Sequence, residues 1–260
     1  MRWLIWLWRE LWPPALFFAL FVMGWSAFVS GFDIKPLILP GPMRVLEAAT
    51  ENQSELLSST WLTAKASLLG LLASLVIGTM VAMLFASSGV IRRGGYPYAI
   101  FLQTVPIIAI APLIVIWFGP GLRSVVIVSF ILSVFPIITN ATTGLLSADT
   151  NLEELFRLHN ASWLQTLIKL RLPSAVPFIL AGLKIGVGAA VIGALVGEFF
   201  VGFEADEFGL GYLIRRYQDE TTNLFAAVLA STLLGVAMFA LASGLSRLVL
   251  SRWFGESTTV

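Results

Sequence analysis

The sequence predicts an all-α integral membrane protein with six membrane-spanning helices. Of its 260 residues, 58% are apolar and only 12% are charged, and the mean hydropathy is +0.89. Because a soluble domain has about 45–50% apolar and about 25% charged residues, an ordinary soluble enzyme is excluded. The net charge of +1 provides no basic excess for binding nucleic acid. The absence of Cys excludes thiolate metal sites and a disulfide scaffold.

Six stretches of the chain have the length and apolar character of a spanning helix, which needs about 20 residues. A short turn, Gly119–Gly121, separates the third stretch from the fourth, whereas a longer segment, 149–173, separates the fourth from the fifth. We therefore expect a single membrane domain over residues 1–260 with its core at 60–253. The expected spans are Leu11–Gly31, Thr60–Ser87, Tyr96–Gly119, Leu122–Leu146, Ser174–Gly202 and Thr222–Trp253.

The distribution of Lys and Arg predicts cytoplasmic N- and C-termini, because cytoplasmic loops carry an excess of basic residues. With this orientation nine basic residues lie inside and five lie outside, while Lys65 and Lys184 fall within spans. The Trp-rich N-terminal segment precedes no small-residue cleavage site. We therefore expect this segment to be retained and not removed as a signal peptide.

The segment 149–173 contains a short amphipathic helix. One of the residues in Asp149–Asn151 is placed to cap it, and Glu153 and Glu154 lie in its first turn, where the helix dipole favours negative charge. Two interpretations of its apolar face remain open: docking into a groove of another protein, or lying on the lipid surface. The residues that share this face by helical spacing are Leu152, Leu155, Phe156 and His159.

The same segment resembles the cytoplasmic signature of binding-protein-dependent ABC importer permeases. That signature reads Glu-Ala-Ala, three residues, Gly, nine residues, then Ile-x-Leu-Pro, and the spacing here is the same. Glu154 stands at the Glu position, Asn160 at the Gly position and Leu172-Pro173 at the final pair. Asn accepts a left-handed backbone more readily than other non-Gly residues, so it is a mild replacement for Gly. Leu155 and Phe156 replace the two Ala, and Leu170 replaces the Ile.

The resemblance extends from about Leu39 to Trp253 and is to the nitrate, sulfonate, taurine and bicarbonate branch of that family. It implies the fold of a type I ABC importer permease, with a cytoplasmic coupling helix between the fourth and fifth spans. The order and spacing of short motifs carry the resemblance: Leu39–Pro42, Val105-Pro106, Ala111–Leu113, Trp117–Gly119, Ala181–Lys184, Gly197-Glu198 and Gly209–Ile214.

The resemblance also implies partners and a location. In that family two permease copies form the translocation path in the cell (inner) membrane, two cytoplasmic ATPases bind the coupling helices, and an external binding protein delivers the solute. The expected solute is a small oxyanion or an organic sulfonate; the alternative is a thiamine-precursor pyrimidine or another heterocycle. The coupling helix is then Glu153–Ser162, and the expected ATPase contacts are Glu153, Glu154, Phe156, Arg157, His159, Asn160, Ala161 and Ser162.

We expect no catalytic residue, metal site or cofactor in this chain. It has no phosphate-binding loop, zinc-protease pattern or nucleophile elbow, so ATP and Mg belong to the partner ATPase. His159, the only His, has no neighbouring ligand-type residues and is expected to be a surface residue. A membrane-embedded enzyme would need clustered His, Asp or Glu, and a structural anchor would not explain the spaced signature.

Polar residues and prolines inside the spans are the candidates for the translocation path. Pro frees backbone groups that lipid tolerates only where protein or a water-filled cavity satisfies them. The alternative for the Ser and Thr hydroxyls is a hydrogen bond back to their own helix. The candidates in the third and fourth spans are Gln103, Thr104, Pro106, Ser133 and Asn140.

The fifth span and the loop after it supply the remaining candidates for a gate. Lys184 and Glu198 lie 14 residues apart, about 21 Å along a straight helix, so they cannot pair. Glu198 either acts at a gate or hydrogen-bonds to another helix, because an unpaired charge is expensive in a membrane. In the loop, Gly209, Gly211 and Tyr212 form either an external gate, a contact for the binding protein, or merely a turn.

Overall fold

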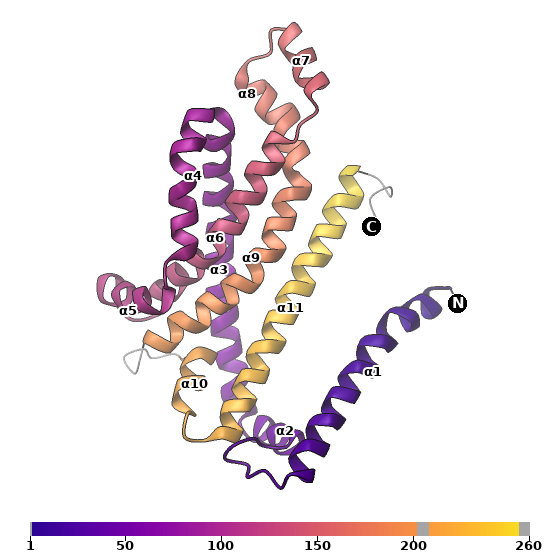
Figure 1. Cartoon of the computed structure of the whole chain (residues 1–260), viewed down its shortest axis with the longest axis vertical. Helices are drawn as coiled ribbons and strands as arrows, with labels where there is room; N and C mark the ends of the chain where they lie inside the picture. Colours follow the sequence, from indigo (N-terminus) through magenta and orange to yellow (C-terminus); the bar gives the residue numbers. More distant parts are fainter. Residues whose placement is uncertain (1, 202–207, 255–260) are drawn as a thin grey trace.

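The chain is built from helices in the computed structural model, which describes residues 2–201 and 208–254 (Figure 1). Within these residues, five helices are long and apolar enough to cross a membrane, and the number rises to six if one bent pair of helices is counted as a single span. The predicted all-α membrane fold is therefore confirmed. The end of the fifth span predicted at Gly202 lies outside the described residues. The five long helices are α1 (Arg2–Gly31), α3 (Gln53–Ser87), α6 (Leu122–Leu146), α9 (Leu172–Val201) and α11 (Thr221–Phe254).

The third span, predicted at Tyr96–Gly119, is interrupted at Pro106, one of the prolines expected to free backbone groups. It consists of α4 (Gly89–Thr104) and α5 (Ile107–Phe118), which are bent by 94° relative to each other. Pro106 causes the break, because it lacks an amide proton and disfavours a helical conformation in the residue before it. Val105 accordingly has an extended backbone, with φ −62° and ψ 126°.

The helices α3, α6 and α9 pack closely because small residues line their contacts. A Cβ added at Gly193 would lie 2.6 Å from the Cα of Ser129, and one added at Gly70 would lie 2.6 Å from the Cβ of Ser129. Small residues allow such approach in lipid, where no hydrophobic drive holds helices together. Hydroxyl groups add hydrogen bonds: Ser129 donates to the Ala190 carbonyl at 2.9 Å, joining α6 to α9.

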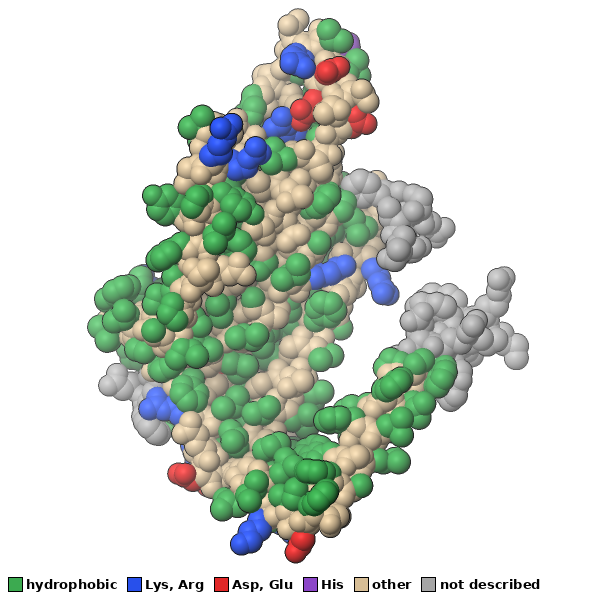
Figure 2. Space-filling view, in the orientation of Figure 1, with side chains coloured by type: hydrophobic (Ala, Val, Ile, Leu, Met, Phe, Trp, Pro, Cys, Tyr) green, Lys and Arg blue, Asp and Glu red, His purple; other side chains and the backbone are tan. Residues whose placement is uncertain are grey.

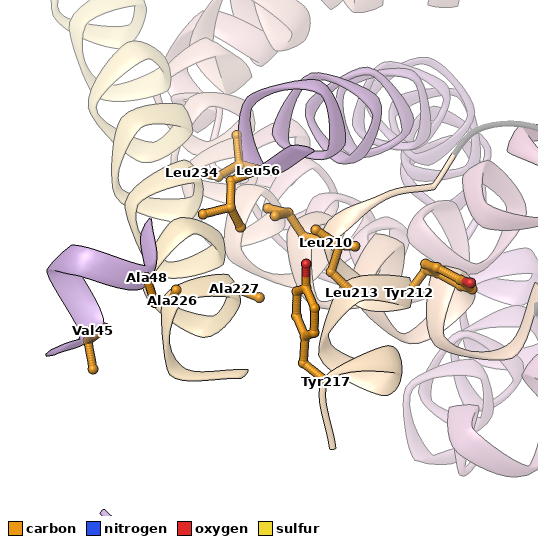
Figure 3. Packing of buried hydrophobic residues seen from close by; sticks show 10 residues of the cluster. All are labelled: Val45, Ala48, Leu56, Leu210, Tyr212, Leu213, Tyr217, Ala226, Ala227 and Leu234. Atoms are coloured by element: carbon orange, nitrogen blue, oxygen red, sulfur yellow. The ribbon is translucent and has the colours of Figure 1, made fainter. Parts of the chain in front are cut away.

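The shorter helices lie at opposite ends of this bundle (Figure 1). At one end, α2 (Pro42–Glu51) and α10 (Leu210–Arg216) pack with α3 and α11 around a buried apolar cluster (Figure 3). At the other end are α7 (Thr150–Leu158), α8 (Trp163–Thr166) and the π-helix η1 (Leu167–Arg171), which continues into α9. On the face shown in Figure 2, acidic side chains lie near the two ends and hydrophobic side chains cover most of the length between them.

The first helix stands apart from the bundle. In Figure 1, α1 leans away from the other long helices and approaches them only near its C-terminal end, where Trp25 contacts Phe225 of α11 with the ring centroids 6.2 Å apart. None of the side chains in its spanning window is buried within the chain. Its apolar surface is therefore available to lipid or to another protein.

The close approach of α6 and α9 predicts opposite effects for two Gly-to-Ala variants of α9. Gly193→Ala inserts a methyl group against the α6 backbone and should lower stability by about 1–3 kcal/mol. Gly188→Ala is the matched control, because no atom lies within 4 Å of its added Cβ, and helix propensity should raise stability by up to about 1 kcal/mol. Thermal unfolding of both variants in detergent measures the difference. Equal unfolding temperatures would contradict this account of the packing.

Candidate functional site

The helix α7 lies at the end of the bundle opposite α10 (Figure 1). The carboxylate of Asp149 accepts a hydrogen bond from the Asn151 amide at 2.8 Å, so Asp149 is the N-cap. The helix runs from Thr150 to Leu158, so the cap expected within Asp149–Asn151 is confirmed. The coupling segment implied by the resemblance, Glu153–Ser162, begins inside this helix and ends in the turn after it. The helix stops because Asn160 adopts a left-handed backbone conformation with φ +52°.

The last four predicted ATPase contacts lie in the turn between α7 and α8. The ring Nδ1 of exposed His159 lies 2.9 Å from the Leu155 carbonyl, and the half-buried Ala161 follows Asn160. Ser162 begins the next helix: its hydroxyl accepts from the Gln165 amide at 3.3 Å, and its own amide donates to Gln165 Oε1 at 2.8 Å. This reciprocal capping fixes where α8 begins.

Exposed apolar side chains cover the tip formed by α7 and α8. Leu152 is 45% exposed, Leu155 is 48% exposed and Leu158 is 79% exposed. Glu154 and Arg157 are exposed beside them, whereas Phe156 is half-buried. The predicted apolar face is therefore present on α7 and open in the described chain. A concave surface next to it is lined by Glu153, Arg157, Asn160, Ala161, Trp163, Thr166 and Arg171.

Arg171 joins the α7 end to the bundle, and sequence reasoning did not single it out. Its Nε donates to Glu153 Oε1 at 2.7 Å, and its Nη1 donates to the Ala86 carbonyl at 3.1 Å, near the end of α3. The half-buried Glu153 is thus paired with a residue of the same chain, while its neighbour Glu154 is exposed. The sequence shows that Arg171 is a basic residue of this segment, but it does not reveal the contact with Ala86, which lies 85 residues away.

At the opposite end, Glu198 of α9 is buried and receives two hydrogen bonds. Its Oε2 accepts from the Thr63 hydroxyl of α3 at 2.9 Å and from the Gly211 amide of α10 at 2.9 Å. The Thr63 oxygen in turn accepts from the Leu210 amide at 2.9 Å. A hydrogen bond to another helix, one of the two roles considered for Glu198, is therefore present. A role at a gate stays a prediction.

The segment predicted as a loop is helical from Leu210, and its two Gly residues, the N-cap Gly209 and Gly211 within α10, allow this close approach. A Cβ added at Gly209 would overlap the Glu198 carboxyl group, and one added at Gly211 would overlap the Leu195 carbonyl. Tyr212 is buried beside them, and its ring stacks on Phe208 with the centroids 4.2 Å apart. The structure thus brings Glu198 into contact with two of the predicted gate candidates, Gly209 and Gly211, and places the third, Tyr212, in the same short helix.

The far end of α10 is also held by polar contacts. Tyr217 donates its hydroxyl to Glu55 Oε2 at 2.6 Å, and Arg216 forms an ion pair with Glu55 Oε1 at 2.7 Å. Burial and the neighbouring carboxylate of Glu55 raise the pKa of Tyr217 to about 12. The hydroxyl therefore remains protonated and able to donate at physiological pH.

The candidates of the third and fourth spans do not join this group. Gln103, Thr104 and Pro106 are exposed at the break between α4 and α5. Ser133 is buried and lies 2.7 Å from the hydroxyl of Ser74, and it also donates to a carbonyl of its own helix. Asn140 is half-buried and donates to the carbonyl of Pro136, four residues earlier, at 2.8 Å. Bonds within the helix, the alternative considered for the hydroxyls, are thus present at Ser133. A pathway role for these five residues stays a prediction.

Within the part of the chain that the structure describes, no group of three or more His, Asp or Glu side chains converges as a metal site would require. The described residues form two distinct features at the ends of the bundle, an exposed amphipathic tip at α7 and a buried polar cluster at α10.

A family model described as "Binding-protein-dependent transport system inner membrane component" matches residues 74–252. The matched region includes α7, α10 and the buried Glu198. The chain belongs to this family of transport permeases. Its resemblance to ABC importer permeases, first indicated by the segment around Glu154, is thereby confirmed.

Two curated relatives of this permease have nearly its length. It is 37% identical over 243 residues to the formylaminopyrimidine transport permease protein ThiX of Halalkalibacterium halodurans, covering 91% of this chain and 94% of the relative. It is 30% identical to the taurine transport system permease protein TauC of Escherichia coli, covering 86% of this chain and 82% of the relative. The family assignment therefore extends over most of the chain.

The fold of the permease has also been seen in a solved transporter. The inward-facing MetNI methionine ABC transporter contains a chain that matches with a TM-score of 0.66 at 20% identity. The match covers 76% of the permease and 97% of that chain. This agreement confirms the predicted type I ABC importer permease fold.

The Arg171 contacts predict that α7 loosens when the ion pair is removed. In Arg171→Gln and Glu153→Gln, amides of α7 should exchange with solvent about fivefold faster, because a partly exposed ion pair contributes about 1 kcal/mol. Glu154→Gln is the matched control, since that side chain is exposed. Hydrogen-exchange mass spectrometry on the detergent-purified chain makes the comparison. Equal acceleration in the control would contradict the role assigned to Arg171.

Proposed function

We propose that two copies of this permease form the translocation path of an ATP-driven importer. Two cytoplasmic ATPases, which carry ATP and Mg, bind the tips formed by α7 and α8, and an external solute-binding protein delivers the solute to the other end. The family match over residues 74–252 is the observation that carries the proposal. The exposed apolar side chains of α7, next to exposed Glu154 and Arg157, support a docking surface at this tip.

The proposed orientation puts the α7 end and both termini in the cytoplasm and α10 outside. The excess of Lys and Arg on the cytoplasmic side of the sequence, nine against five, supports this arrangement. The exposed Leu residues of α7 then face the ATPase, and the buried cluster around Glu198 lies at the external mouth of the path. ATP-driven closure of the ATPases would move α7, and the packed helices would carry that motion toward the external end.

For the solute we propose an aminopyrimidine or a similar heterocycle. The relative ThiX, whose name gives formylaminopyrimidine as its solute, is 37% identical over 94% of its length, which supports this class. An organic sulfonate is the second candidate, supported by the 30% identity to the taurine permease TauC. The external binding protein selects the solute in the proposed assembly, so both candidates are compatible with the same path.

Purification of the tagged permease from its native host in mild detergent tests the assembly. A nucleotide-binding ATPase should be recovered with the natural chain, and at least tenfold less of it with Glu154→Arg, because the exposed carboxylate lies on the docking surface. Glu51→Arg, at the exposed last residue of α2 at the other end, is the matched charge reversal and should retain the ATPase. Recovery of no ATPase with the natural chain would overturn the proposed assembly.

Uptake of labelled solutes by cells tests the substrate class. Deletion of the permease should abolish uptake of labelled formylaminopyrimidine at micromolar concentration and leave uptake of taurine unchanged. Expression of the natural chain should restore it. Loss of taurine uptake with unchanged formylaminopyrimidine uptake would establish the second candidate instead.

A further inference from the structure

Hydrogen bonds attach the helix α10 to two spans, α3 and α9. They are made at both ends of α10. At its beginning, the Gly211 amide binds Glu198 of α9 and the Leu210 amide binds Thr63 of α3. Near its end, the Nη1 of Arg215 donates to the Phe199 carbonyl of α9 at 3.0 Å. This double attachment distinguishes α10 from a loop that is free to open.

Contacts with α3 complete the attachment at the end of α10. Arg216 and Tyr217 both bind the carboxylate of Glu55, which lies in the first turn of α3. Each of the two spans therefore holds α10 at two separate points: α3 through Thr63 and Glu55, and α9 through Glu198 and Phe199.

Apolar packing also holds α10 against the bundle. Leu210 and Leu213 are fully buried, and Tyr212 and Tyr217 are 6% exposed. They belong to a cluster that also includes side chains of α2, α3 and α11 (Figure 3). Lifting α10 away from the bundle would expose this cluster to water and break the hydrogen bonds described above.

The polar side chains around Glu198 are packed too closely to change partners while α10 stays where it is. The carboxyl group fills the position that a side chain at Gly209 would take. The Thr63 hydroxyl has one proton and two acceptors within reach, Glu198 Oε2 at 2.9 Å and the Ser59 carbonyl of its own helix at 3.0 Å. Thr63 therefore links α9 to α10 with a single oxygen that both donates and accepts.

We propose that Glu198 and Thr63 are positioning residues that fix α10 to α3 and α9, so that α10 moves with these spans during import and does not open as a separate lid. The inference rests on the proposed function, because α10 then lies at the external mouth of the path. Access from outside is accordingly controlled by the relative movement of larger helix groups that carry α10 with them.

A disulfide in place of the hydrogen bonds tests this inference. The chain has no Cys, so Glu198→Cys with Gly209→Cys forms the only thiol pair. Removal of the carboxyl group frees the space for the new side chain, the Cβ added at Gly209 points at the carboxyl carbon, and the extended backbone of Gly209, with φ −86°, accepts any residue. Uptake is measured in proteoliposomes with the ATPase and binding protein, before and after oxidation.

The measured quantity is the amount of solute transported per ATP hydrolysed. It should be at least tenfold lower than in the natural chain for Glu198→Cys alone and for the reduced double variant. Oxidation of the double variant should restore it to at least half of the natural value. Oxidation that blocks transport, with recovery on reduction, would overturn the inference, because α10 would then have to leave α9. Full transport by Glu198→Cys alone would also overturn it. A natural chain that transports no solute under these conditions would refute the proposed function and leave the next measurement to decide the attachment.

Hydrogen exchange measures the attachment without any transport. Thr63→Val keeps the shape of the side chain and removes the hydrogen bonds of Thr63 with Glu198 and with the Leu210 amide. The Leu210 and Gly211 amides should therefore exchange with solvent about tenfold faster. Thr79→Val in the same helix is the matched control, because its buried hydroxyl has no hydrogen-bond partner among the described residues. Unchanged exchange at Leu210 and Gly211 in Thr63→Val would overturn the inference.

Discussion

The close packing of α3, α6 and α9 is the constraint on which the rest of the structure depends. In lipid no hydrophobic drive brings helices together, so van der Waals contact and hydrogen bonds between helices must do so. Gly193 and Gly70 allow both neighbours of α6 to reach the backbone around Ser129. The hydroxyl of Ser129 then binds α9 directly. A closely packed three-helix unit results, and both the α7 end and the α10 end of the molecule are attached to it.

The two ends use the unit in different ways. At the α7 end, one side chain, Arg171, reaches from the end of η1 to both Glu153 and the last turn of α3. The rest of the tip is open, with Leu158 exposed. At the α10 end, the contacts with Glu198 and Thr63 are buried. An open tip suits an exchangeable partner, whereas a buried polar cluster suits a part that must keep its position, because unsatisfied polar groups are costly there.

Much of the local structure could be predicted from the sequence because its causes are local. Asn160 was expected to tolerate a left-handed backbone and has φ +52°. Pro106 was expected to disturb the third span, but the 94° bend between α4 and α5 was not. A proline removes a hydrogen bond and restricts its predecessor, yet the angle that follows depends on what the two segments pack against. The start of α7 was expected from a cap within Asp149–Asn151 and is set by Asp149, because capping is also a local effect.

The sequence by itself determined that this protein lies in lipid, how many apolar helices it has and where an amphipathic segment interrupts them. Those properties follow from composition, from helical periodicity and from residues close together in the chain. The tertiary structure alone decided that Glu198 meets Thr63, 135 residues earlier, and that Arg171 meets Glu153. Such contacts depend on how the helices pack, and a polar side chain in a membrane takes whichever partner that packing brings within reach.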